Sequence, residues 1–425
     1  MNINELLKTK KCGCGMEHSC DIKDIAIGKG VINSIGNLAR DYSSIVIVAD
    51  TNTYAVCGEL VKGQITDKLE RIQIFEGDGL LIPDEKAIDE VTEKITDKTD
   101  LIIGIGSGVI QDLCKYVSFK EGLPYYIVAT APSMDGYASK GAAMIIGNMK
   151  VTYNAHVPEA IIADTDILKD APIDMIKSGY GDILGKFSCL NDWKLSNVIN
   201  GEYLCEYVYD LTYEMLDKTK DLGNSLLLRD EDAIKFLMEA LVGVGIAMAY
   251  VGNSRPASGS EHHLSHFFEI VGILKNEPYF MHGTDVAYSA VYTQKLREEL
   301  LKTETPSKSK GLSRDEWESE IRRVYLGAAD GVIELQDKIK MYENQSIDIC
   351  CSKWNEIKEV LKEAPSSEEM IKYLNSVGLD IAEFEKMYGE EKIKDAILYA
   401  KDLKDRYSVL WLYSWLNTKK DNCII

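Results

Sequence analysis

Leu101-Ile102-Ile103-Gly104-Ile105-Gly106-Ser107-Gly108 joins an uninterrupted apolar run to a glycine-rich turn. A continuous run of this kind is typical of a strand that is buried on both faces of a parallel sheet. Helical periodicity begins directly after the turn, at Val109-Ile110-Gln111-Asp112. This order of strand, tight turn and helix predicts an α/β domain.

The same alternation extends over residues 24–164. Further β-branched runs stand at residues 45–49, 71–75, 125–129 and 160–163, with helical patterns between the strands. Residues 143–153, with Gly147-Asn148 in the middle, predict a β-hairpin. We therefore expect an N-terminal nucleotide-binding domain with a parallel sheet over residues 1–170.

The pattern after Pro172 is helical, which predicts an all-α domain over residues 171–425. Two helix starts are legible where a Ser is followed three residues later by a Glu, as a capping box requires: Ser313/Glu316 and Ser366/Glu369. Residues 303–312 are rich in Ser, Lys, Thr and Pro and predict an exposed loop.

Composition limits the function classes. A chain of 425 residues that is 45% hydrophobic is long enough for two domains. Its 48 basic and 68 acidic residues give a net charge of −20, which disfavours nucleic acid and anionic membranes as partners. The apolar stretch at 236–251 contains Glu239 and is shorter than the roughly 20 residues of a membrane helix. The N-terminus does not resemble a signal peptide, so we expect a cytoplasmic protein without membrane insertion.

Four of the six histidines lie at positions 262, 263, 266 and 282. His262 and His266, one helical turn apart, share a helix face. Asp182, His262 and His282 would supply one oxygen and two nitrogens to a catalytic divalent metal and leave positions open for substrate. A single histidine is more often structural, but two at this spacing with a third before a glycine favour a metal site.

Two turns at the carboxyl ends of predicted strands are candidates for cofactor binding. The turn at 104–112 is either a phosphate cradle at a helix N-terminus or an ordinary tight turn. In the turn at 130–139, we expect Ser133 and Asp135 either to contact a cofactor or polyol or only to cap turns. Asp50 is either a ribose acceptor or a turn cap.

The ten cysteines are too dispersed for a disulfide scaffold, so we expect most to be reduced. Cys12, Cys14, His18 and Cys20 form one cluster at the N-terminus. Its spacing fits the usual zinc pattern poorly, and a reduced, partly exposed segment is the default expectation.

Taken together, these segments resemble the superfamily of iron-containing alcohol dehydrogenases and dehydroquinate synthases, and specifically its sn-glycerol-1-phosphate dehydrogenase family of the bacterial AraM type. The matching motifs are Gly106-Ser107-Gly108-Val109-Ile110-Gln111-Asp112, Thr130-Ala131-Pro132-Ser133-Met134-Asp135-Gly136-Tyr137-Ala138-Ser139, Gly181-Asp182, Ser254 to His266, and His282-Gly283. The N-terminal Cys12, Cys14, Gly15 and His18 match a segment that bacterial members often have. The resemblance covers residues 25–292 and implies a dehydroquinate-synthase-like fold, with the site in a cleft between the two domains.

The resemblance also implies roles for residues. It implies a divalent Zn, Ni or Fe ion on Asp182, His262 and His282. It places Asp135, Asp182 and His266 at the substrate, with Asp182 and His266 as the catalytic pair. The expected NAD(P) contacts, with Asp50 added from its position after a strand, are Asp50, Gly106, Ser107, Gly108, Val109, Ile110, Gln111, Asp112, Thr130, Ala131, Pro132, Ser133 and Ser139.

The implied activity is the reversible reduction of dihydroxyacetone phosphate to sn-glycerol 1-phosphate with NAD(P)H, in a homodimer. His266 would exchange the proton, and Arg255 or Lys186 would either offset the substrate phosphate or form ion pairs. Asp50 would repel a 2′-phosphate, which favours NAD. The alternatives are another polyol or aldehyde dehydrogenase of the superfamily (glycerol or phosphonoacetaldehyde type), a dehydroquinate-synthase-like lyase, and a non-catalytic protein on the same scaffold.

Overall fold

The computed structural model describes residues 3–77, 81–146, 149–343 and 346–416. The chain divides into two compact units: unit 1 is Met1–Gly179 with Ser225–Gly252, and unit 2 is Tyr180–Asn224 with Asn253–Ile425. The expected domain boundary at residue 170 differs from this division. The difference arises because the chain returns to unit 1 at Ser225–Gly252 after it has entered unit 2.

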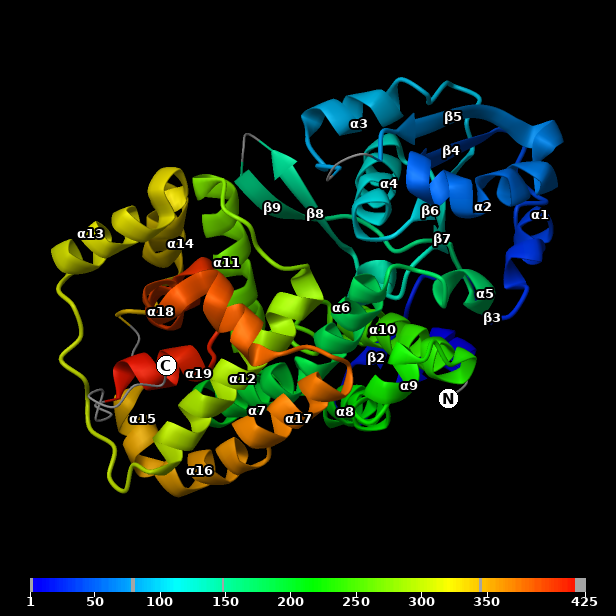
Figure 1. The fold of residues 1–425 in the computed structure, drawn as a ribbon. Helices are drawn as coiled ribbons and strands as arrows, with labels where there is room; N and C mark the ends of the chain where they lie inside the picture. Colours follow the sequence, from blue (N-terminus) through cyan, green and yellow to red (C-terminus); the bar gives the residue numbers. More distant parts are fainter. Residues whose placement is uncertain (1–2, 78–80, 147–148, 344–345, 417–425) are drawn as a thin grey trace. The chain divides into compact units, whose positions relative to one another are not determined.

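Unit 1 is built on a six-stranded parallel sheet (Figure 1). In spatial order its strands are β3 (Asp24–Gly28), β10 (Ala160–Asp164), β7 (Tyr125–Ala129), β6 (Leu101–Gly106), β4 (Ile45–Asp50) and β5 (Leu69–Phe75). The five runs named from the sequence are all strands, and the edge strand β3 is added to them. The predicted α/β domain with a parallel sheet is confirmed.

Helices cover both faces of this sheet. α1 (Ile35–Leu38) and α2 (Thr51–Gln64) pack on the face that receives Ile47 and Ile103. α3 (Glu85–Thr92) and α4 (Gly108–Glu121) pack on the face that receives Val48. Because successive strand side chains point to opposite faces, a strand covered on both sides is apolar at every position.

Two antiparallel hairpins complete the strands of unit 1. β8 (Gly141–Ile146) pairs with β9 (Met149–Asn154), which confirms the hairpin predicted at 143–153. Its predicted turn, Gly147-Asn148, lies outside the described residues. β1 (Lys10–Lys11) pairs with β2 (Glu17–His18), a hairpin that the sequence analysis did not predict. The short helices of unit 1 are η1 (Ile3–Leu7), η2 (Val31–Ser34), η3 (Thr66–Lys68), η4 (Asp135–Ala138) and α5 (Thr165–Leu168).

Helix α10 (Glu231–Val251) is a core helix of unit 1. It is the one described helix that is long and apolar enough to cross a membrane, and it extends beyond the apolar stretch recognised at 236–251. Most of its side chains are buried, and it packs against η4, α5 and β3. A Cβ on Gly245 would lie 2.8 Å from Ala138 Cβ, so this glycine permits the close contact with η4. The apolar composition of α10 therefore serves the interior of unit 1.

Unit 2 is helical, as predicted. Its helices are α7 (Lys186–Asn200), α8 (Glu206–Thr219), α11 (Ser260–Lys275), α12 (His282–Leu301), α13 (Arg314–Tyr325), η5 (Leu326–Ala328), α14 (Ala329–Ile339), α15 (Ile347–Ser352), α16 (Trp354–Lys362), α17 (Ser367–Ser376), α18 (Ile381–Tyr399), η6 (Ala400–Leu403) and α19 (Val409–Trp415). α6 (Ile173–Leu184) and α9 (Gly223–Leu227) contain two of the three points where the chain passes between the units, and the third follows α10, between Gly252 and Asn253. α12 lies at the centre, in contact with α7, α11, α16, α17 and α19.

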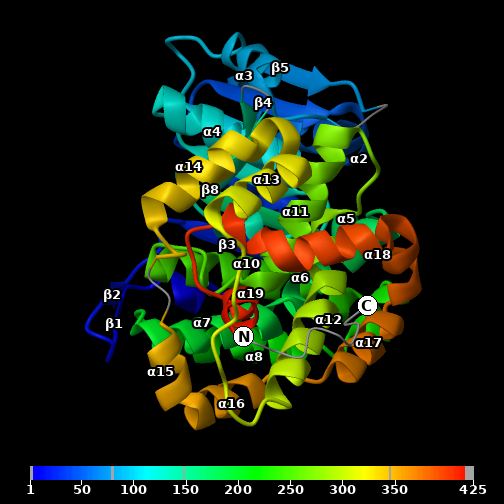
Figure 2. The same cartoon turned by 90° about the vertical axis from the view of Figure 1, so that its left-hand side faces the viewer.

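The predicted helix starts of unit 2 are confirmed. Ser313 and Ser366 each accept from the backbone N–H of the third residue of the helix, and Glu316 and Glu369 complete the two capping boxes. Residues 303–312 contain no helix, as expected of a loop. Figure 2 shows α13, α14 and α18 of this unit nearest the viewer.

Candidate functional site

Asp182, His262 and His282 converge in unit 2. One ligand atom of each residue lies within 4.8 Å of the other two. His262 Nε2 is 3.6 Å from Asp182 Oδ1, and the ring centroids of His262 and His282 are 5.1 Å apart. Asp182 is fully buried, whereas His282 keeps partial access to solvent. The structure therefore brings together the three residues that the sequence analysis named as metal ligands.

Glycines set the distance between the helices that carry Asp182 and His282. A Cβ on Gly181 would lie 2.4 Å from the carbonyl oxygen of Gly283, and one on Gly185 would lie 2.4 Å from Val286 Cγ1. A side chain at Gly181 would force α6 or α12 to move, and one at Gly185, the N-cap residue of α7, would collide with the side chain of Val286. The glycines beside Asp182 therefore allow the backbone of α6 to approach α12, where His282 is the first residue.

A buried carboxylate fixes the start of α11. Asp192 Oδ2 accepts from the backbone N–H of Ser260 at 2.7 Å, which satisfies a donor that an isolated helix end leaves without a partner. Asp192 Oδ1 accepts from Arg297 at 2.7 Å, so the buried charge is paired. Because α11 begins at Ser260, His262 lies in its first turn and His266 one turn later.

Glu261 orients His262. Its Oε1 lies 2.6 Å from His262 Nδ1 and accepts from the backbone N–H of Gly259 at 2.8 Å. An imidazole that donates from Nδ1 to a carboxylate presents the lone pair of Nε2, here toward Asp182. Burial, with Lys186 as the next contribution, lowers the pKa of His262 well below its usual value, which keeps the ring neutral. Glu261 was not predicted from the sequence, although its position directly before His262 is a signal that could have identified it.

Lys186 holds Asp182 in its ionised form. Lys186 Nζ donates to Asp182 Oδ1 at 2.8 Å and to Ala257 O at 2.9 Å, and both charged side chains are fully buried. Burial alone would raise the pKa of Asp182, but Lys186, followed by His282 and His262, brings that pKa below its usual value. Of the two roles considered for Lys186, the structure shows the ion pair.

Arg255 is also paired. Its Nε donates to Glu202 Oε1 at 2.6 Å, and one terminal nitrogen donates to Tyr407 O at 2.8 Å. The guanidinium thus connects segments of unit 2. Both Arg255 and Lys186 form the ion pair that was one of the two roles expected of them.

The donor set fits a divalent transition metal. The distance of 3.6 Å between His262 Nε2 and Asp182 Oδ1 is too long for a hydrogen bond. It is close to the roughly 3.4 Å that separates two ligands of a tetrahedral cation with bonds of about 2.1 Å. One ionised carboxylate and two imidazoles suit Zn, Ni or Fe alike. Three protein ligands leave a further position for a substrate oxygen.

His266 lies beside this group, and His263 does not. The ring centroid of His266 is 5.5 Å from that of His282 and 6.0 Å from that of His262. His263 is fully buried, and neither of its ring nitrogens has a hydrogen-bond partner among the described residues. The expected register, in which His262 and His266 share a face of α11, therefore agrees with the structure.

In unit 1, the turn after β6 leaves the start of α4 open. Ser107 is the N-cap residue of α4, but its side chain makes no capping hydrogen bond. A Cβ on Gly108 would meet nothing within 4 Å, whereas one on Gly106 would lie 2.6 Å from Ile110 Cβ. Gly106 thus serves the tight turn, and the first N–H groups of α4 are open to an anion.

The side chains of Gln111 and Asp112 point into the protein. Gln111 donates to Tyr137 O at 3.0 Å, and Asp112 accepts from Ala143 N at 3.1 Å. Lys115, which the sequence analysis did not name, donates to Gly136 O at 3.1 Å and to Gly141 O at 2.7 Å. These three side chains of α4 hold the segment that contains Asp135 and Ser139. Any contact of residues 111 and 112 with a cofactor would therefore be through the backbone.

The turn at 130–133 packs closely on α6. A Cβ on Gly179 would lie 1.8 Å from Pro132 O, and Ser178 donates to Ser133 O at 3.1 Å. Thr130, Ala131, Ser133, Asp135 and Ser139 are all buried.

Asp50 is the N-cap residue of α2. Its Oδ1 accepts from Thr53 N at 2.8 Å, as the turn-capping alternative requires. Contact of Asp50 with a ribose stays a prediction, like the other cofactor contacts.

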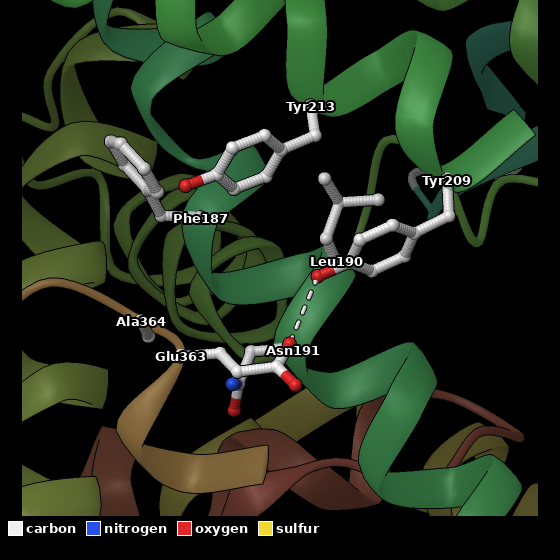
Figure 3. A pocket seen from close by; sticks show the side chains of 7 residues that line it. All are labelled: Phe187, Leu190, Asn191, Tyr209, Tyr213, Glu363 and Ala364. Atoms are coloured by element: carbon white, nitrogen blue, oxygen red, sulfur yellow. Dashed lines mark hydrogen bonds between the residues drawn. The ribbon is translucent and has the colours of Figure 1, made fainter. Parts of the chain in front are cut away.

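A small pocket in unit 2 lies among Phe187, Tyr209, Tyr213 and Glu363 (Figure 3). Tyr209 Oη donates to Glu363 Oε2 at 3.4 Å, which is the dashed line in that view. None of Asp182, His262 and His282 lines this pocket. It is therefore separate from the candidate metal centre.

Replacement of Glu261 by Gln should weaken metal binding about 10–100-fold, because the carboxylate that fixes the tautomer of His262 is lost. The measurement is a competition titration with a chromophoric chelator. Glu277→Gln is the matched control, because Glu277 forms an exposed ion pair with Lys392 just after the end of the same helix. Equal metal affinity in wild type and Glu261→Gln would show that Glu261 does not orient a ligand.

The chain is similar to known dehydrogenases. Residues 26–172 match the family model described as iron-containing alcohol dehydrogenase. The glycerol-1-phosphate dehydrogenase [NAD(P)+] of Halalkalibacterium halodurans is 35% identical over 315 residues, which are 70% of this chain and 79% of that protein. The protein of the same name from Bacillus licheniformis is 28% identical over 420 residues, 96% of this chain and 94% of that protein.

Solved structures show the same fold. A probable glycerol dehydrogenase from Sinorhizobium meliloti superposes with a TM-score of 0.61 at 15% identity, covering 95% of this chain and 94% of that one. Sulfoacetaldehyde reductase from Bifidobacterium kashiwanohense, solved with NAD+, gives a TM-score of 0.59 at 14% identity, covering 90% and 92%. By its identity to the relatives over most of their length, this chain belongs to the glycerol-1-phosphate dehydrogenase family.

Proposed function

We propose that this protein catalyses the reversible reduction of dihydroxyacetone phosphate to sn-glycerol 1-phosphate with NAD(P)H and one divalent metal. In the forward direction the ketone takes up one hydride from the nicotinamide and one proton, and NAD(P)+ is released. The observation that carries the proposal is the convergence of Asp182, His262 and His282. The names of the relatives from Halalkalibacterium halodurans and Bacillus licheniformis support the substrate and the cofactor.

The metal would be held by Asp182, His262 and His282. Glu261 contacts His262, and Lys186 contacts Asp182. When bound, the metal supplies Lewis acidity toward the carbonyl oxygen, and the nicotinamide cofactor supplies the hydride. Glu261 keeps Nε2 of His262 directed at the site, and Lys186 keeps Asp182 ionised. These contacts reduce the rearrangement that metal binding requires.

His266 is the proposed proton donor in the direction of reduction. It lies one turn after His262 on α11, and partial exposure to solvent allows it to regain a proton. We also propose that Asp135 lies near the substrate, as the resemblance to the glycerol-1-phosphate dehydrogenase family implies.

In unit 1, the proposed cofactor contacts are the open N-terminus of α4 and the turn at 130–133. The backbone N–H groups of Gly108 and Val109 suit a pyrophosphate, because a helix N-terminus favours anions. Asp50 favours NAD, since its carboxylate would repel a 2′-phosphate.

Arg406 is the proposed anchor for the substrate phosphate, in place of Lys186 and Arg255. It donates to Ser258 O at 3.0 Å and forms no ion pair with a carboxylate among the described residues. Burial, with Arg255 as the next contribution, lowers the pKa of Arg406. Its charge also contributes to the lowered pKa of His262, which places it within electrostatic reach of the metal ligands. A half-buried cation that forms no ion pair among the described residues is suited to pair with a phosphate dianion.

A cytoplasmic location and a homodimer stay predictions of the sequence analysis. Among the alternative activities, no contact in the described residues favours a glycerol or phosphonoacetaldehyde enzyme or a lyase. Stoichiometric consumption of NADH would exclude a lyase that returns the hydride to its substrate within one turnover.

Removal of metal should abolish the reduction of dihydroxyacetone phosphate, and a single divalent metal should restore it. The assay follows NADH and NADPH oxidation after chelation and after separate addition of Zn, Ni and Fe, alongside elemental analysis. NADH should be the better cofactor. Full activity in protein that has been shown to be free of metal would refute the proposed mechanism.

His266→Gln should lower kcat for dihydroxyacetone phosphate about 10²–10⁴-fold, the usual contribution of a positioned acid or base. Its metal content should match that of wild type, because His266 is not a proposed ligand. His282→Ala should lose both metal and activity. An unchanged kcat and pH profile in His266→Gln would assign the proton transfer to another group.

Arg406→Met should raise KM for dihydroxyacetone phosphate at least tenfold and leave KM for dihydroxyacetone, which lacks the phosphate, nearly unchanged. Arg322→Met is the control, because Arg322 forms an exposed ion pair with Asp330 on the surface of unit 2. Equal changes in KM for the two ketones would contradict a role in phosphate binding.

A further inference from the structure

The β1–β2 hairpin, residues 10–18, carries three side chains of the kinds that bind metals, Cys12, Cys14 and His18. Lys10 lies opposite His18 in the hairpin register, and Cys12 N donates to Met16 O at 3.0 Å. Gly15 closes the loop with a φ of +88°, a conformation that L-residues rarely adopt. The loop therefore presents Cys12 and Cys14 on the same short hairpin whose return strand carries His18.

His18 is fixed in the orientation that a metal ligand needs. Its Nδ1 lies 3.0 Å from Tyr250 O, and because a carbonyl only accepts, Nδ1 carries the proton of the neutral ring. The lone pair of Nε2 then faces Cys14 Sγ at 3.5 Å. The ring is fully buried and stacks on Tyr250 of α10, with centroids 5.3 Å apart. Metal-binding histidines commonly donate their other ring N–H to a backbone carbonyl in this way.

We propose that Cys12, Cys14 and His18 form a second metal site, which binds zinc. The two sulfur atoms and His18 Nε2 lie within 4.8 Å of one another. Two thiolates and an imidazole are donors that zinc accepts in structural sites. The fourth ligand is water or another thiol of the chain. This proposal replaces the expectation of a reduced, partly exposed segment.

The usual structural zinc pattern has a second, distant pair of ligands, which the sequence of this segment does not show. A Cys-x-Cys pair is a poor match to the usual pattern, but the hairpin supplies the third ligand from the opposite strand. Cys20, which the sequence grouped with this cluster, is not among the residues whose ligand atoms converge here, so we do not include it. Bound zinc would link the hairpin to α10 through the contact of His18 with Tyr250.

The proposed zinc site is chemically distinct from the candidate metal centre. Asp182, His262 and His282 offer oxygen and nitrogen, whereas Cys12 and Cys14 offer sulfur. Only thiolate ligands give bound cobalt(II) an intense charge-transfer absorption in the near ultraviolet. Cobalt(II) is therefore a probe that reports on the two sites separately.

The experiment loads the full-length metal-free protein with cobalt(II) and measures the absorption spectrum and the bound cobalt. Wild type should show the thiolate band and bind two equivalents. Cys14→Ser should lose the band and one equivalent, and His262→Ala should keep the band and lose the other. Cys57→Ser, a buried cysteine of α2, is the matched control and should behave as wild type.

Absence of the thiolate band in wild type would overturn the proposal, even if Cys14→Ser fails to fold. A band that persists in a folded Cys14→Ser would also overturn it. So would a disulfide between Cys12 and Cys14, detected by mass spectrometry without reduction. Loss of cobalt from His262→Ala alone would instead test the proposed function, so the two proposals can fail independently.

Discussion

The buried carboxylate of Asp182 is the constraint on which the candidate site depends. A charge without water is costly unless it is paired, and removal of one partner of a buried ion pair is strongly destabilising. Lys186 Nζ, 2.8 Å from Asp182 Oδ1, provides that pairing within the same helical stretch of sequence, at i and i+4. The pair makes an ionised metal ligand compatible with folding before any metal is bound. Loss of Lys186 would therefore affect both the fold of unit 2 and the affinity for metal.

Close contacts at glycine determine where that carboxylate lies. Gly179 allows Pro132 O to approach α6 in unit 1, and Gly181 allows Gly283 O to approach it in unit 2. Gly179 and Gly181, two residues apart on α6, thus permit close contacts with two different backbone segments. A helix with alanine at these positions would keep its periodicity and lose both contacts. Local helix propensity, which favours alanine over glycine, is overridden here by packing.

The parts of the fold that could be predicted are those that local sequence encodes. Strands β4 and β6 were recognisable because burial on both faces leaves no polar position, and Ser313 and Ser366 were recognisable because a capping box is contained in four residues. The sequence did not predict that α10 packs in unit 1. An apolar helix has the same sequence pattern whether it is buried in one unit or in the other. The spacing of His262 and His266, with His282 directly before a glycine, marks a candidate metal site in the sequence. Glu261 has a local signal, its position directly before His262, but the sequence leaves two roles open for Lys186, since its ion pair with Asp182 is a contact that only the folded chain creates.

The two donor sets also bear on how metal content should be interpreted. Thiolates at Cys12 and Cys14 favour zinc, whereas one carboxylate and two imidazoles bind several first-row metals, and availability decides among them. If zinc occupies the hairpin, purified protein will contain zinc whether or not the site at Asp182 is filled. Total zinc is then no measure of catalytic competence. The metal that matters for the reaction is the fraction that disappears in His262→Ala and remains in Cys14→Ser, and activity should follow that fraction alone.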